Sequence, residues 1–209
     1  MKFLALSGSA RNLSTNTAML RAVAVAARPD HEVCVFDRIA DLPVFSPDLE
    51  GDPLPEAVRD FVAQIGGCDG LILASPEYVR AIPGGLKNAL DWLVSRDEII
   101  NKPIVLMHAS HRGEDVLAQL RLVLATVSTR FCADPFLRFE LMKNSPAEIE
   151  SHLSQRQTAG QLANSSKISL PSAASSAPPC PVPSLAWASL CRDGQFLPIL
   201  QEGLVYAAV

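Results

Sequence analysis

The sequence predicts an α/β fold, with a doubly wound parallel sheet of five strands covered by helices. Two observations predict it. Short apolar runs of strand length alternate with segments whose apolar residues recur at helical spacing, a pattern typical of parallel sheets between helices. The first and third runs also lead into polar loops that open helices, as expected at a ligand-binding sheet edge. The 209 residues, 48% hydrophobic and 19% charged, suit one domain with an extension.

The strands are expected where the apolar runs lie. They are residues 2–7, 31–37, 70–75 and 102–110, with a fifth, more irregular segment at 130–141. Each of the first four runs is short and rich in Val, Ile, Leu and Phe, as strands buried on both faces are.

The helices are expected between these runs. Residues 14–28 form an Ala-rich helix with Ser14 as its cap, and apolar residues recur at helical spacing over 57–65 and 115–127. Another helix opens at Pro83, because proline suits the first helical position. Its stripe of Leu and Ala faces the sheet, whereas Trp92 lies off the stripe and is expected to contact another subunit.

The loop after the first strand decides the strand order. It reads GSARNL, residues 8–13, with one glycine instead of the three of a dinucleotide-binding GxGxxG loop. The chain also has no GK[ST] triplet of a P-loop. The flavodoxin-like order 2-1-3-4-5 therefore remains, and its switch point lies between the first and third strands.

The composition changes near residue 163. Residues 165–184 are rich in Ser, Ala and Pro, which is a linker composition that cannot bury enough apolar surface to fold. We expect a flavodoxin-like domain at residues 1–162. Residues 163–209 are a low-complexity C-terminal tail, disordered or loosely docked.

Charge and cysteine content exclude several classes of function. Eighteen basic and 22 acidic residues give a net charge of -4 without a basic run, so nucleic acid is not an expected partner. The five cysteines and four histidines show no metal-ligand spacing. No apolar run has the length of a signal peptide or a membrane span, so we expect a cytoplasmic protein with reduced cysteines and without a membrane partner.

The first polar loop has the composition of a phosphate site. Within nine residues it supplies three hydroxyls, an amide and a guanidinium, from Ser9, Ser14, Thr17, Asn16 and Arg11. The N–H groups of the helix that starts there add further donors. A simple helix cap with spare polar neighbours is the alternative interpretation.

The second polar loop is suited to a flat ring. Pro76 keeps the preceding residue extended, and Glu77, Tyr78 and Val79 can then present backbone N–H and C=O groups to the polar edge of a ring system. Glu77 needs no acid–base role, and Tyr78 either stacks on the ring or packs against the protein. The two loops together predict a flavin mononucleotide (FMN) site.

These two motifs, GSARNLSTNT and PEYVRAIPGGLKNALDW, resemble those of the NAD(P)H-dependent FMN reductases over about residues 1–160. The resemblance implies that the first loop binds the FMN phosphate through Ser9, Arg11, Ser14, Asn16 and Thr17.

The same resemblance places Pro76, Glu77, Tyr78 and Val79 at the isoalloxazine ring, with Ser110 from a third loop. Two departures stand out. Val79 occupies a position where the family often has Asn, and the third loop reads HASHRG at 108–113 where the family is often Gly-rich.

The expected function is that of an NAD(P)H-dependent flavin oxidoreductase. A hydride passes from NADPH or NADH to FMN, and the electrons then pass to a small acceptor: a flavin, quinone, azo compound or metal oxyanion. Because the flavin carries the chemistry, no catalytic acid–base residue is expected. Arg80 and Arg112, in loops near the predicted ring, are the candidate reductant-binding residues.

Two alternatives stay open. One is a flavodoxin-type electron carrier that docks on a redox partner, and the other is a flavin-fold protein without activity. An enzyme of this family is expected to be a homodimer or homotetramer.

Overall fold

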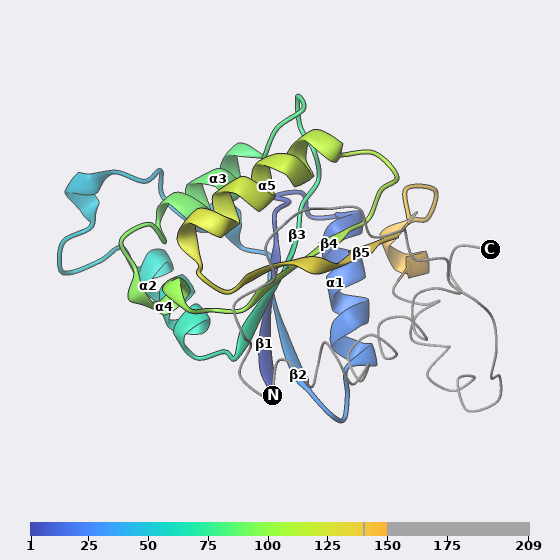
Figure 1. Cartoon of the computed structure of the whole chain (residues 1–209), viewed down its shortest axis with the longest axis horizontal. Helices are drawn as coiled ribbons and strands as arrows, with labels where there is room; N and C mark the ends of the chain where they lie inside the picture. Colours follow the sequence, from blue (N-terminus) through green and yellow to red (C-terminus); the bar gives the residue numbers. More distant parts are fainter. Residues whose placement is uncertain (140, 150–209) are drawn as a thin grey trace.

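The computed structural model describes residues 1–139 and 141–149, and within them five strands form one parallel sheet (Figure 1). The strands run in the order β2-β1-β3-β4-β5, which confirms the predicted flavodoxin-like topology. Their bounds are β1 Lys2–Ser7, β2 Glu32–Phe36, β3 Gly70–Ala74, β4 Ile104–His108 and β5 Phe131–Arg138. The predicted tail at 163–209 and the domain boundary before it lie outside the described residues.

Helices cover both faces of the sheet. Helix α1 (Thr15–Ala26) lies on one face, and α2 (Glu56–Gly66), α3 (Gly84–Asp91), α4 (Asp97–Ile100) and α5 (Glu114–Val127) lie on the other (Figure 1). Two short 3-10 turns, Ile39–Asp41 and Pro47–Leu49, interrupt the loop before α2. The apolar side chains divide in the same way into two buried clusters, because successive residues of each strand point to opposite faces.

The helix starts follow from capping chemistry. Ser14 is extended, and its side chain accepts a hydrogen bond from the backbone N–H of Thr17 at 3.3 Å, so it caps α1 as predicted. Pro83 is also extended, with ψ 138, and directly precedes α3 instead of being its first helical residue. The difference is one residue.

The expectation of a subunit contact at Trp92 is wrong. This side chain is fully buried, and its indole Nε1–H donates to the carbonyl of Pro43 at 2.8 Å. Its ring also packs edge-on against Phe45. The loop before α2 therefore supplies the pocket that Trp92 fills. The sequence did not indicate that this loop packs against the end of α3.

Membrane spans, metal clusters and disulfides can be assessed only in the described part of the chain. No helix in residues 1–139 and 141–149 is long and apolar enough to span a membrane. The same residues contain no cluster of metal-ligating side chains, and no disulfide joins their three cysteines, Cys34, Cys68 and Cys132.

Candidate functional site

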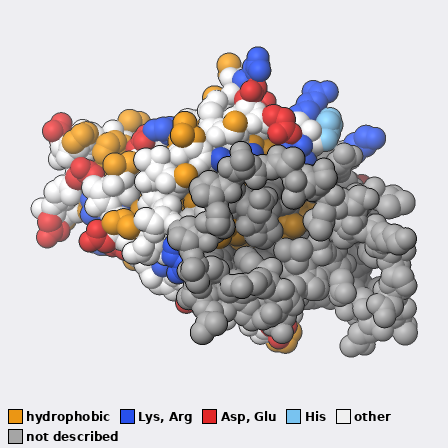
Figure 2. Space-filling model, viewed as in Figure 1, with side chains coloured by type: hydrophobic (Ala, Val, Ile, Leu, Met, Phe, Trp, Pro, Cys, Tyr) orange, Lys and Arg blue, Asp and Glu red, His pale blue; other side chains and the backbone are white. Residues whose placement is uncertain are grey.

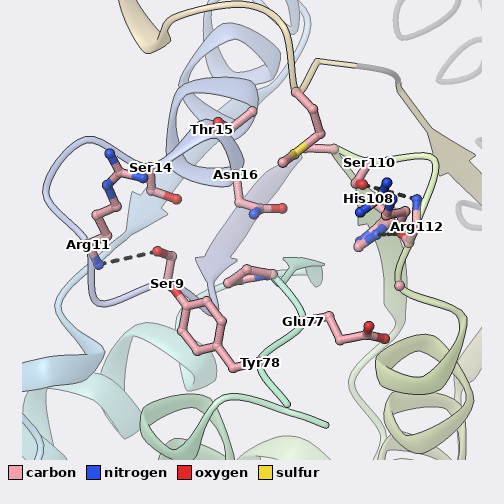
Figure 3. Close-up of a pocket in the computed structure, with 14 residues that line it drawn as sticks. Ser9, Arg11, Ser14, Thr15, Asn16, Glu77, Tyr78, His108, Ser110 and Arg112 are labelled. Atoms are coloured by element: carbon pink, nitrogen blue, oxygen red, sulfur yellow. Dashed lines mark hydrogen bonds between the residues drawn. The ribbon is translucent and has the colours of Figure 1, made fainter. Parts of the chain in front are cut away.

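A cavity of about 400 Å³ lies at the carboxyl ends of β1, β3 and β4, where the predicted switch point falls (Figure 3). Its wall comes from the three loops that follow these strands. The lining residues are Ser9, Arg11, Ser14, Thr15, Asn16, Pro76, Glu77, Tyr78, His108, Ala109, Ser110, Arg112, Gly113 and Met142. Nine of the twelve residues predicted for the site line this cavity, and Thr17, Val79 and Arg80 do not.

The first loop is held close to the sheet. The backbone N–H of Gly8 donates to the carbonyl of Ala74 at 2.7 Å, which ties the end of β1 to the end of β3. A Cβ at Gly8 would come within 2.7 Å of both the Ser75 hydroxyl and the Leu86 side chain. Only glycine therefore allows this approach, and it places Ser9 and Arg11 at the mouth of α1.

The polar groups of this loop suit an anion at the start of α1. Ser9, Ser14 and Asn16 are buried, and the first turn of the helix carries no acidic residue. Its free N–H groups and dipole therefore favour a negative charge. The amide oxygen of Asn16 is buried without a hydrogen-bond partner, so it can accept from a ligand hydroxyl or N–H. This set of donors and acceptors fits the phosphate and polyol chain of FMN.

Thr17 stabilises the first loop from the side that faces away from the cavity. Its hydroxyl hydrogen-bonds the Ser7 hydroxyl at 2.8 Å, and its N–H donates to Ser14. Thr17 is buried and does not line the cavity. Its position links the end of β1 to the first turn of α1.

The second loop lines the cavity through Pro76, Glu77 and Tyr78 and then turns away from it (Figure 3). Tyr78 and Ala81 exchange two backbone hydrogen bonds, of 3.2 and 3.0 Å, across a two-residue turn. Val79 and Arg80 form that turn with φ of 51° and 58°, the left-handed geometry that suits glycine and asparagine. The Val79 side chain is 98% exposed at the tip.

Helix α5 anchors this turn from outside. Arg80 pairs with Asp115 at 2.5 Å, which lowers the pKa of that carboxyl. Gln119 accepts from the N–H of Ile82 at 3.2 Å and donates to the carbonyl of Arg80 at 3.0 Å. The guanidinium of Arg80 is therefore engaged with α5 in this structure, away from the cavity.

The Glu77 carboxylate is a further link to α5. It accepts from the backbone N–H of Val116 at 3.0 Å, at the start of the helix. This contact satisfies one of the helix's free N–H groups, so Glu77 has a structural role at the start of α5.

The third loop contains a histidine that the sequence argument did not assign. His108 ends β4, is 3% exposed and lines the cavity. Burial lowers the pKa of its imidazole; the hydrogen bond to the Arg112 carbonyl opposes this change, and the charge of Arg138 adds to it. The ring is therefore neutral near pH 7.

Four more lining residues were missed, namely Thr15, Ala109, Gly113 and Met142. Ala109 and Gly113 belong to the same third loop as His108. Thr15 is the first residue of α1, so its place at the mouth of the helix could have been read from the Ser14 cap. Met142 follows β5, and its approach to the cavity depends on where the chain turns after the strand. That turn leaves no signal in the sequence.

The rim of the cavity is basic. Arg11 and Arg112 are exposed, and within the described part of the chain neither takes part in an ion pair. Figure 2 shows Lys, Arg and His side chains along the upper edge of the molecule, with acidic side chains between them. In Figure 1 this edge lies above the carboxyl ends of the strands. The site therefore favours anionic ligands.

Comparison with known proteins assigns the chain to a family. A family model described as NADPH-dependent FMN reductase matches residues 1–138. The chain belongs to the NADPH-dependent FMN reductase family. This confirms the resemblance drawn from the two loop motifs.

Curated relatives of the family carry reductase names. A 2-hydroxy-1,4-benzoquinone reductase of a Burkholderia species is 42% identical over 92 residues, which are 44% of this chain and 49% of the relative. The quinone reductase of Escherichia coli K12 is 33% identical over 113 residues, 53% of this chain and 60% of the relative. This chain thus spans about half to three-fifths of the length of these relatives.

A solved structure agrees with the fold. The flavoenzyme FerB of Paracoccus denitrificans, an NAD(P)H:(acceptor) oxidoreductase, has a TM-score of 0.59 and 27% identity. The similarity covers 65% of this chain and 77% of that one. It extends the family assignment from sequence to three-dimensional arrangement.

Proposed function

We propose that this protein is an NAD(P)H-dependent flavin oxidoreductase that binds FMN in the cavity. The observation that carries the proposal is the pairing of two loops across the switch point. An anion-binding helix start stands on one side of the cavity, and a backbone-lined wall stands on the other. Family membership supports the same function.

The lining residues divide by the part of FMN that they would hold. Ser9, Arg11 and Ser14, with the N–H groups at the start of α1, would bind the phosphate. Asn16 lies next to them and offers its unpartnered amide oxygen to the polyol. The side chains of these residues face the same cavity in Figure 3.

The other wall would hold the ring. Pro76, Glu77 and Tyr78 border the cavity from the end of β3, and Ser110 borders it from the end of β4. Bound FMN would supply the redox chemistry, accepting a hydride from a nicotinamide and passing electrons to a small acceptor. The protein residues orient the two partners and limit the access of water.

Arg112 is the favoured contact for the reductant's phosphates. It lines the cavity, and no acidic residue of the described chain pairs with it. Arg80 stands outside the cavity and pairs with Asp115, so its predicted contact with the reductant would require that pair to open. We expect Arg112→Ala to raise the KM for NADPH roughly threefold to tenfold, with kcat little changed.

A quinone is the acceptor that the relatives favour, since those described above are named for quinone reduction. Free flavin is the next candidate, because another relative, from Pseudomonas aeruginosa, is named an NAD(P)H-dependent FMN reductase. Azo compounds and metal oxyanions stay open. A cytoplasmic location and a homodimeric or homotetrameric assembly remain predictions.

The electron-carrier alternative is less well supported. Carriers of this fold dock through acidic surfaces, whereas the rim of this cavity presents Arg11 and Arg112. A flavin-fold protein without cofactor would have no need for the buried, unpartnered amide oxygen of Asn16.

The purified protein tests the proposal. We expect flavin absorption bands in its visible spectrum after incubation with FMN and gel filtration, and bleaching of these bands by NADPH or NADH without oxygen. Added benzoquinone should restore them. Bound FMN that neither nicotinamide reduces would favour the electron carrier, and failure to bind FMN would favour the inactive protein.

A further inference from the structure

His108 is a buried imidazole in the wall of the cavity, and the functional assignments above give it no task. Its Nε2 lies 2.5 Å from the backbone carbonyl oxygen of Arg112. A carbonyl oxygen can only accept, so Nε2 carries the proton and donates it. The ring is then a neutral Nε2–H tautomer, and its Nδ1, which is buried without a partner, is unprotonated.

The third loop is folded around this ring. Gly113 has a left-handed backbone with φ 105°, and a Cβ there would come within 2.5 Å of the His108 Nε2. The N–H of Arg112 donates to the hydroxyl of Ser110 at 3.0 Å, which closes the loop from the other side. The imidazole therefore takes up the space inside the loop, and Gly113 leaves room for it.

The position of Arg112 follows from this arrangement. Its backbone is held twice, by its carbonyl to His108 and by its N–H to Ser110. Its side chain is exposed at the cavity rim. Figure 3 shows the three residues together at one edge of the cavity.

We propose that His108 is a positioning residue: its Nε2–H fixes the backbone of Arg112 and so places the guanidinium where it meets the phosphates of the nicotinamide reductant. The proposal rests on the proposed function, because it assigns the reductant to this rim. It makes His108 a determinant of reductant affinity, acting through Arg112 without touching the reductant.

Kinetics with FMN-saturated protein test the coupling. His108→Leu removes the donor, whereas His108→Gln keeps an N–H that can reach the Arg112 carbonyl. We expect His108→Leu to raise the KM for NADPH roughly twofold to tenfold, the effect of one hydrogen bond, with kcat little changed. His108→Gln should have a KM for NADPH close to that of the parent protein. His111→Leu, an exposed histidine of the same loop that does not line the cavity, is the matched control.

A double-mutant cycle then separates positioning from a general loss of structure. In an Arg112→Ala background, His108→Leu should have no further effect on the KM for NADPH. Multiplying effects of the two changes would overturn the proposal, as would a His108→Gln variant no better than His108→Leu.

The ring itself gives a readout that does not need activity. Long-range ¹H–¹⁵N spectra of the protein without cofactor should show His108 as the neutral Nε2–H tautomer at pH 7. An Nδ1–H tautomer, which leaves Nε2 without a proton to donate, would overturn the proposal even if the Leu variant failed to fold. If the protein oxidises neither NADPH nor NADH, the proposed function fails and the role toward the reductant is overturned with it; the tautomer then reports only on the contact with Arg112.

Discussion

Val79→Asn should stabilise the protein. Val79 is a β-branched residue at φ 51°, and its side chain is 98% exposed. The left-handed conformation costs an ordinary residue roughly 1–2 kcal/mol, and asparagine tolerates it better. Since Val79 has almost no buried surface to lose, the change should recover about 0.5–1 kcal/mol of unfolding free energy, or roughly 1–4 °C in Tm.

Urea unfolding followed by circular dichroism would measure this gain. Val94→Asn is the matched control, because Val94 is also exposed, at 68%, but has a negative φ. It should leave stability unchanged or lower it. A Val79→Asn variant no more stable than the parent, or a gain of equal size in Val94→Asn, would refute the argument from backbone strain.

Three further predictions concern the cavity walls. Gly8→Ala should cost about 1–3 kcal/mol in urea unfolding, because its Cβ would press on Ser75, whereas Gly84→Ala, with open space around it, should cost nothing. Gln119→Ala should loosen the second loop and weaken FMN binding in a fluorescence titration by roughly twofold to tenfold. An unchanged affinity would show that the loop keeps its conformation without the Gln119 hydrogen bonds. Burial lowers the pKa of His108, so the unfolded chain takes up the proton first as the pH falls below about 6.5, and stability should drop there. His108→Gln should flatten that drop, and an equally steep loss in this variant would contradict it.

Most of the fold could be predicted from periodicity alone. The apolar runs predicted the strands to within a few residues. The absence of a GxGxxG pattern from the first loop predicted their order. Trp92 shows where this reasoning ends. Its position off the helical stripe indicated a surface contact, but the loop before α2 folds over it and supplies both a carbonyl and an aromatic ring. Such a contact between distant segments has no periodic signal.

The candidate site divides in the same way. Residues next to a strand end, such as Ser9 and Pro76, could be placed from sequence because the sheet edge fixes them. Arg80 could not, since its partner Asp115 lies 35 residues away and the turn that presents it is left-handed. His108 also ends a strand, but its inward position depends on the room that Gly113 leaves.

Binding of FMN at the start of α1 is the central claim, and a fluorescence titration of FMN with the parent protein and the Arg11→Ala variant tests it most directly. A charge-assisted contact to phosphate contributes about 1.5–3 kcal/mol, so Arg11→Ala should raise the Kd roughly tenfold to hundredfold. Arg59→Ala, on the exposed side of α2, should leave it unchanged. No binding by the parent protein, or equal Kd values for the parent and Arg11→Ala, would contradict the account.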